Sequence, residues 1–221
     1  DPAFYYQPGA GPMFDMGPYY LTALVSLLGP IVRVGSSAGI SFPERTITSE
    51  PKRGEVIQVN TPTHIAATLD FASGAIGTIT TSFDLYDTTH SVLTVYGSEG
   101  TLRLPDPNTF GGTISLLQSA AYKAQRDPLS VGRRPGEEPV SPTADPTWED
   151  VSLTHGFTDN SRGLGVSDLA RSIRDGTPAR ASGDLAYHVL DIMHATLESS
   201  DEGRHITIES TLQRPAALPA S

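Results

Sequence analysis

The sequence contains no cysteine. Disulfide bonds, thiolate nucleophiles and cysteine-ligated metal sites are therefore excluded within the chain. This absence suits the cytoplasm and the exterior alike, and the location we expect is the cytoplasm. Histidine offers no alternative metal site, because His188 and His194 share an expected helix but are six residues apart, which places them on different faces. We expect no bound metal.

Positive charge and long apolar runs are also scarce. The chain has 15 Lys and Arg against 25 Asp and Glu, a formal net charge of -10. Such a surface repels phosphate backbones, which disfavours nucleic-acid binding. The longest apolar stretch is interrupted by Thr22 and Ser26 and ends at Gly29, so it is too short for a membrane span. The length of 221 residues is ample for a hydrophobic core.

The segment from Gly9 to Gly29 is the most informative for chemistry, because it places a carboxylate and two phenols at the front of an expected helix. Asp15 and Tyr19 are four residues apart and lie on one helix face, where a carboxylate beside a phenol can handle protons. The spacing also fits a second interpretation, in which Asp15 only caps the helix. Asp15 is a favoured N-cap residue, and Pro18 is tolerated in a first turn.

The rest of the chain predicts an α+β fold. We expect a large, open, mainly antiparallel or mixed sheet with helices on one face. The clearest signal is a hairpin that turns at Ser73-Gly74. The expected helices are residues 12–28 (or 15–28), 166–174 and 184–200; the expected strands are 31–37, 54–60, 63–71, 75–83, 91–96, 100–104, 112–118, 148–153 and 205–209.

One domain is expected over residues 1–212. Residues 119–146 are rich in proline, glycine and charge, which predicts a flexible excursion. Residues 213–221 are expected to form a loose tail. The sheet face that carries Thr78, Thr80 and Ser82 is expected to be polar and uncharged, which alone permits a plain solvated surface.

The segment after Gly9 resembles the second signature of the glucose-fructose oxidoreductase, inositol dehydrogenase and rhizopine catabolism (Gfo/Idh/MocA) family, roughly G-G-G-x-x-x-D-x-G-x-H-x-x-D. Gly9, Gly11, Asp15 and Gly17 match it, whereas Tyr19 stands at the histidine and Thr22 at the final aspartate. Residues 63–83, 93–108 and 160–199 also resemble the carboxy-terminal domain of this family.

The resemblance implies an NAD(P)-dependent oxidoreductase that transfers hydride from a sugar, inositol or related polyol. Asp15 and Tyr19 are then the catalytic candidates: Asp15 would orient the substrate or the catalytic lysine of the family, and Tyr19 would hydrogen-bond an oxygen at or beside the reacting carbon. The resemblance also implies a homo-oligomer that forms through the open sheet face.

The resemblance further implies an N-terminal Rossmann domain, with its G-x-G-x-x-G turn and catalytic lysine, as a partner. Neither motif occurs in this sequence. NAD or NADP would therefore bind mainly to that domain, and we expect no tight cofactor binding to this chain alone. The chain is interpreted as the second half of an enzyme.

Further polar residues are candidates for substrate binding. Tyr6 and Tyr20 offer ring faces and hydroxyls to a sugar, although core packing near the first helix also explains such tyrosines. His155, Asn160 and Arg162 form a polar loop that precedes a helix. For Asn160, capping of that helix is the simpler interpretation.

A different class of function stays open. Because the chain lacks the dinucleotide fingerprint and the lysine, it would also fit a stand-alone sugar-binding or oligomerisation module without redox activity.

Overall fold

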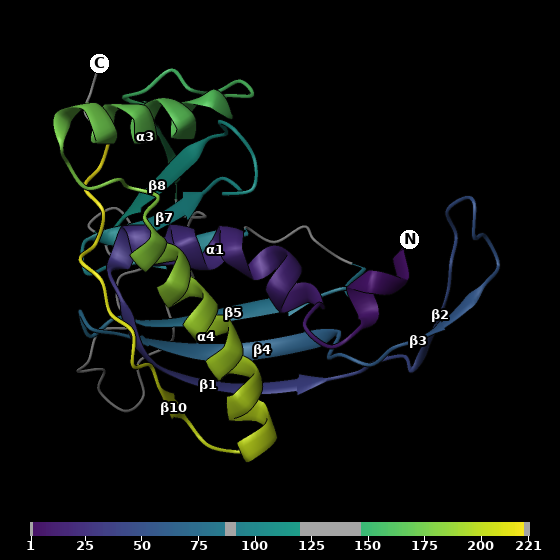
Figure 1. Cartoon of the computed structure of the whole chain (residues 1–221). Coiled ribbons are helices and arrows are strands. Elements are labelled where there is room, and N and C mark those ends of the chain that lie inside the picture. The colour runs from purple at the N-terminus through teal and green to yellow at the C-terminus, as the bar shows by residue number, and fades with distance from the viewer. Residues whose placement is uncertain (1, 87–91, 120–146, 219–221) are drawn as a thin grey trace. The chain divides into compact units, whose positions relative to one another are not determined.

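The computed structural model describes residues 2–86, 92–119 and 147–218 (Figure 1). These residues form two compact units. Residues 2–86 and 162–218 belong to the first unit, and residues 92–119 and 147–161 belong to the second. The excursion predicted for 119–146 lies outside the described residues from 120 onward.

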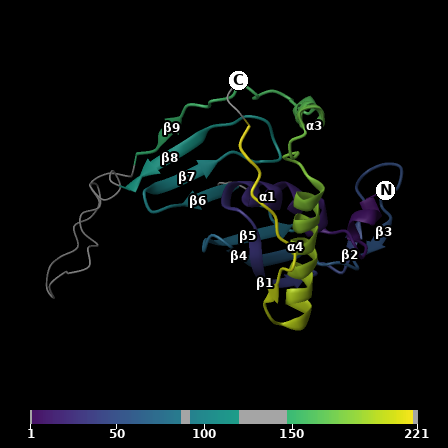
Figure 2. The same cartoon turned by 60° about the vertical axis from the view of Figure 1, so that its left-hand side comes forward.

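The first unit is built on a four-stranded antiparallel sheet of order β10-β1-β4-β5. Two helices, α1 and α4, contact this sheet and each other, and Figure 2 shows them beside its strands. The strands are β1 (Ile31–Gly39), β4 (His64–Phe71), β5 (Ile76–Ser82) and β10 (Ile206–Thr207); the helices are η1 (Pro2–Tyr6), α1 (Pro12–Leu28), α3 (Gly163–Asp175) and α4 (Gly183–Glu202).

The core lies between the sheet and the two helices. Alternate residues of β4, namely Ile65, Ala67, Leu69 and Phe71, are buried, as the alternation predicted. The apolar residues of α4 at helical spacing, among them Ile192, join the same cluster. Helix α4 begins at the N-cap Ser182, whose hydroxyl accepts a hydrogen bond from the Leu185 N–H at 3.1 Å. The predicted helix-on-sheet packing is thus confirmed.

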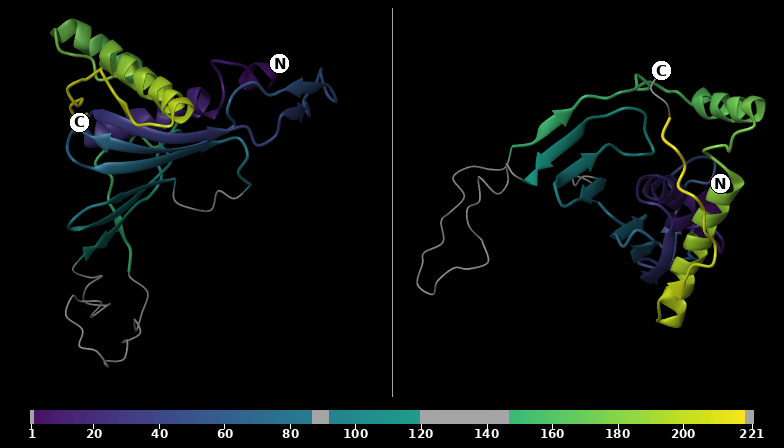
Figure 3. Two further views of the ribbon diagram at one scale, coloured as in Figure 1. Left: turned by 90° about the horizontal axis from the view of Figure 1, so that it is seen from below. Right: turned by 90° about the vertical axis from the view of Figure 1, so that its left-hand side faces the viewer.

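A short hairpin pairs the strand that was expected at residues 54–60 with a strand that the sequence analysis did not predict. Strands β2 (Glu44–Thr46) and β3 (Val56–Gln58) pair antiparallel, with Arg45 opposite Ile57. This hairpin extends beyond the four-stranded sheet (Figure 3). The strand expected at 54–60 is confirmed as β3, whereas β2 was not predicted, because a three-residue strand is too short to produce a clear alternation.

The second unit contains a separate four-stranded antiparallel sheet of order β6-β7-β8-β9. Its strands are β6 (Leu93–Tyr96), β7 (Gly100–Leu104), β8 (Ile114–Gln118) and β9 (Glu149–Val151). The guanidinium of Arg103 lies 3.8 Å above the centre of the Trp148 ring. The α+β class is confirmed, and its strands divide into this sheet, the first-unit sheet and the β2–β3 hairpin.

Residues 213–218, which were expected to be loose, are held to the first unit although they form no helix or strand. Arg214 Nη1 donates to the Leu27 carbonyl at 3.0 Å. Arg180 Nε and Nη2 donate to the carbonyls of Ala216 and Ala217 at 3.0 and 3.2 Å. Arginine side chains thus supply contacts that the apolar pattern of this segment did not reveal.

His188 of α4 is fully buried and joins three segments of the first unit. Its Nε2 accepts the Ile31 N–H at 3.1 Å, so Nδ1 carries the ring proton toward the Ser210 hydroxyl, 2.8 Å away. The Ser210 N–H in turn donates to Asp191 at 3.1 Å. Burial lowers the pKa of His188 below its ordinary value of 6.5, although the Asp191 charge and the contact with Ser210 oppose this.

A depressed histidine pKa makes stability depend on pH. The stabilisation that neutral His188 contributes is complete above pH 6.5. It is lost as the pH falls through the lower pKa that His188 has in the folded state, because the unfolded chain binds the proton first. We expect the melting temperature to fall from pH 6.5 to pH 5, and His188→Gln to flatten this dependence. His194→Gln is the control, since His194 is exposed on the same helix. Equal pH profiles of the two variants in calorimetry would contradict the assignment.

In the described ranges, no helix is long and apolar enough to cross a membrane. Over the same residues, no group of three or more histidine and acidic side chains is arranged to hold a metal ion.

Candidate functional site

The start of α1 is fixed by backbone geometry rather than by a polar cap. Gly11 occupies the N-cap position with φ 90° and ψ 172°, a conformation almost restricted to glycine, and Pro12 begins the helix. A β-carbon at Gly11 would lie 2.9 Å from the Pro62 carbonyl oxygen. Asp15 is therefore the fourth residue of the helix and caps nothing, so the N-cap interpretation of this residue was wrong.

Asp15 and Tyr19 are both exposed, one turn apart on the same face of α1. The Tyr19 side chain is 48% accessible. Among the described residues, no side chain donates a hydrogen bond to the Asp15 carboxylate. Both groups are thus available to a ligand, and the carboxylate also lies near the positive end of the helix dipole.

Gly17, the next glycine of the signature, lies on the opposite, buried side of α1. A β-carbon at this position would lie 2.9 Å from the Met13 sulfur and 3.3 Å from the Met193 sulfur. Glycine therefore lets α1 approach α4 closely. The signature glycines Gly11 and Gly17 have structural roles here, whereas Asp15 has no visible structural partner.

The other candidates have varied surroundings. Tyr6 is half-buried in η1, and its ring packs edge-on against Phe83, with the ring centres 5.7 Å apart. Tyr20 is half-buried on α1 beside exposed Tyr19. Arg162 stands at the N-cap position of α3 in the first unit. Helix α3 begins directly after Arg162, so capping of this helix by Asn160 was a wrong prediction.

His155 and Asn160 belong to the second unit. The His155 ring stacks on Phe157 at 5.8 Å between ring centres. Its Nδ1 is buried and has no hydrogen-bond partner among the described residues. Asn160 is exposed. The roles of both residues in substrate binding stay predictions.

A buried ion pair in the first unit was missed by the sequence analysis. Arg45 of β2 pairs with Asp84, and the Thr63 hydroxyl donates to the same carboxylate at 2.6 Å. Burial works against the charge of Asp84, but hydrogen bonds from Ser41, Thr63 and Arg45 outweigh it and hold the Asp84 pKa below its ordinary value. Arg45 and Asp84 are 39 positions apart, so no local spacing signals the pair.

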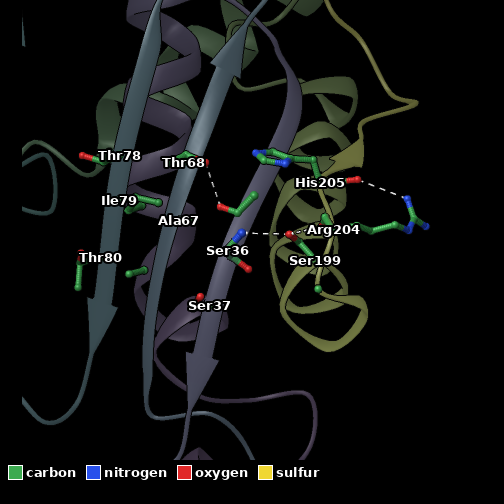
Figure 4. Close-up of a pocket in the computed structure, with 13 residues that line it drawn as sticks. Ser36, Ser37, Ala67, Thr68, Thr78, Ile79, Thr80, Ser199, Arg204 and His205 are labelled. Atoms are coloured by element: carbon green, nitrogen blue, oxygen red, sulfur yellow. Dashed lines mark hydrogen bonds between the residues drawn. The ribbon is translucent and has the colours of Figure 1, made fainter.

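The sheet face that points away from the core is polar, as predicted. Thr78 and Thr80 are exposed on β5, opposite Thr68 and Ala66 of β4. An open groove of about 420 Å³ runs over this face and the adjoining end of α4. Figure 4 shows these threonines with Arg204 and His205 at the rim. The Arg33–Asp70 ion pair lies near one end of the face.

Comparison with known proteins confirms the resemblance. Residues 1–103 match the family model described as the GFO/IDH/MocA C-terminal domain. No curated protein sequence matches the chain.

Several solved oxidoreductases share the fold. Levoglucosan dehydrogenase in its apo form is 15% identical, with a TM-score of 0.67 over 92% of this chain and 52% of that one. Its complex with NADH and levoglucosan gives 15% identity and a TM-score of 0.64 over 93% and 53%. An NAD-binding oxidoreductase from Klebsiella pneumoniae is 19% identical, with a TM-score of 0.64 over 90% and 51%. The chain spans about half the length of each.

Proposed function

We propose that the chain, whose residues 1–103 match the family model of the GFO/IDH/MocA C-terminal domain, is the substrate-binding half of an NAD(P)-dependent oxidoreductase. The reaction would be hydride transfer from a CH–OH carbon of a sugar, inositol or related polyol. One observation carries the proposal: Asp15, the signature carboxylate, is exposed on α1 with no internal partner in the described part of the chain.

The face of α1 would bind and orient the polyol. An ionised Asp15 accepts hydrogen bonds from hydroxyl groups, and the Tyr19 phenol donates one or accepts one at an adjacent oxygen. Because the two side chains lie one helical turn apart, they suit hydroxyls on neighbouring carbons of one sugar. Tyr20, Tyr6 and Arg162, which belong to the same unit as Asp15, are proposed as further substrate contacts.

The hydride acceptor would be NAD or NADP, which supplies the redox chemistry when bound. The residues of this chain do not fit such a cofactor, because the sequence has no glycine-rich turn between a strand and a helix. We place the dinucleotide on a separate Rossmann domain. Levoglucosan dehydrogenase, which shares the fold of this chain, has been solved with NADH and levoglucosan, and this likeness supports the choice of a sugar-derived polyol as substrate.

We also propose that the protein forms a homo-oligomer through the open sheet face. The chain carries a net charge of -10, yet Gly35, Thr68, Thr78 and Thr80 leave the centre of this face uncharged. Two copies would meet there with little repulsion. Sedimentation velocity tests this proposal, since a monomer at micromolar concentration contradicts it.

The function is tested by following NADH or NADPH formation at 340 nm with the full-length product of the gene that encodes this chain. Levoglucosan, glucose and inositol are supplied in turn with NAD or NADP. We expect polyol-dependent reduction of at least one dinucleotide. Binding of a polyol in calorimetry with no reduction of either dinucleotide would favour the stand-alone module instead.

A further inference from the structure

The Arg45–Asp84 pair lies in a largely buried position within the first unit. The Asp84 side chain is 7% exposed and that of Arg45 is 23% exposed. The Asp84 carboxylate receives Arg45 on one oxygen and Thr63 on the other. Placing a charge pair here costs desolvation energy, which is recovered only when the geometry of the pair is well defined.

The guanidinium of Arg45 also lies within cation–π distance of two aromatic rings. Its central carbon lies 5.0 Å from the centre of the Phe42 ring and 5.5 Å from that of Tyr6. Tyr6 packs against Phe83 on another side. The Arg45 Nε is buried without a hydrogen-bond partner among the described residues. The planar shape and charge of arginine are therefore used here to hold rings in place, a role that lysine fills poorly.

The segment from Tyr6 to Gly11 is hydrogen-bonded to the residues that precede β4 in the chain. The Tyr6 carbonyl accepts the Asn60 N–H at 2.8 Å. The Gln7 side chain accepts from the Asn60 amide at 3.1 Å and donates to the Gln58 carbonyl at 3.3 Å. Thr61 donates to the Ala10 carbonyl at 3.4 Å. Residues 6–11 thus run along residues 58–62 directly into α1, four residues before Asp15.

We propose that Arg45 and Asp84 form a positioning pair that fixes the Tyr6 ring, and with it the segment that leads into the substrate-binding face of α1. The expected effect of the pair on substrate binding rests on the proposed function. Its expected effect on residues 6–11 rests only on the contacts described above. Neither residue touches substrate in this account. Their role is to keep residues 6–11 in one conformation before the polyol binds.

Two variants test the pair in the full-length gene product. Arg45→Lys keeps the charge but loses the planar fork, and Asp84→Asn keeps the size but loses the charge. We expect amide hydrogen exchange over residues 6–11 to accelerate about tenfold in each, with exchange in α4 unchanged. We also expect KM for the polyol to rise about tenfold while kcat changes less than about twofold.

Arg53→Lys is the matched control, because Arg53 pairs with Glu50 at 2.9 Å on the exposed surface. It should change none of these quantities. Unchanged exchange over residues 6–11 in both variants would overturn the positioning role whether or not the protein is an oxidoreductase. Faster exchange with an unchanged KM would overturn its link to substrate binding. Failure of the wild type to reduce either dinucleotide would instead overturn the proposed function, and exchange alone would then decide whether the pair holds the segment.

Discussion

Replacing Asp15 by asparagine is expected to lower kcat of the full-length enzyme by about 100-fold or more, because an amide neither accepts a proton nor carries charge at the substrate hydroxyls. Stability should change little. The carboxylate has no internal partner in the described residues, so its loss removes only a helix-dipole contribution of about 0.3–1 kcal/mol. Turnover at 340 nm and a thermal melt measure the two effects.

Asp184→Asn is the matched control for this substitution. Asp184 is exposed and lies in the first turn of α4, so it feels a similar helix dipole without a proposed role in chemistry. Both variants should show the same small shift in melting temperature, and only Asp15→Asn should lose turnover. Retention of full activity by Asp15→Asn would reduce Asp15 to an ordinary surface residue near a helix start.

Gly11→Ala is expected to have the largest effect on stability, about 2–4 kcal/mol. Two costs combine: the backbone conformation of Gly11 strains any residue with a β-carbon, and that carbon would press on the Pro62 carbonyl. At about 2–4 °C per kcal/mol for a protein of this size, the melting temperature should fall by roughly 4–16 °C.

Gly29→Ala separates the two costs. Gly29 ends the same helix with φ 92° and ψ -173°, nearly the same conformation, but a β-carbon there meets no atom within 4 Å. It should therefore lose only the strain part, about 1–3 kcal/mol. Equal destabilisation of the two variants would show that the contact with Pro62 contributes nothing to the start of α1.

The sequence predicted the elements whose apolar pattern is long. Helix α4 and the β4–β5 hairpin bury one face over several turns or residues, so their periodicity is clear. Strand β2 was missed because its three residues carry too little pattern, whereas its partner β3 lies within the strand that was predicted at 54–60. The Asp15 cap was mistaken because the true N-cap is Gly11, whose conformation is not visible in the sequence.

In the candidate site, too, contacts between near neighbours in the sequence could be predicted, whereas contacts between distant residues could not. Asp15 and Tyr19 are neighbours on a helix, so their spacing alone places them on one face. The Arg45–Asp84 pair joins residues that are 39 positions apart, and the hydrogen bond between Ile31 and His188 joins residues that are 157 positions apart. Such contacts depend on how strands and helices meet in space, and no local pattern encodes them.

The central claim is that the Asp15 and Tyr19 face of α1 binds the polyol. A crystal structure of the full-length gene product with a dinucleotide and a polyol that it oxidises tests this directly. We expect polyol oxygens within hydrogen-bond distance of both the Asp15 carboxylate and the Tyr19 hydroxyl. A polyol bound elsewhere, with Asp15 facing solvent, would contradict the claim.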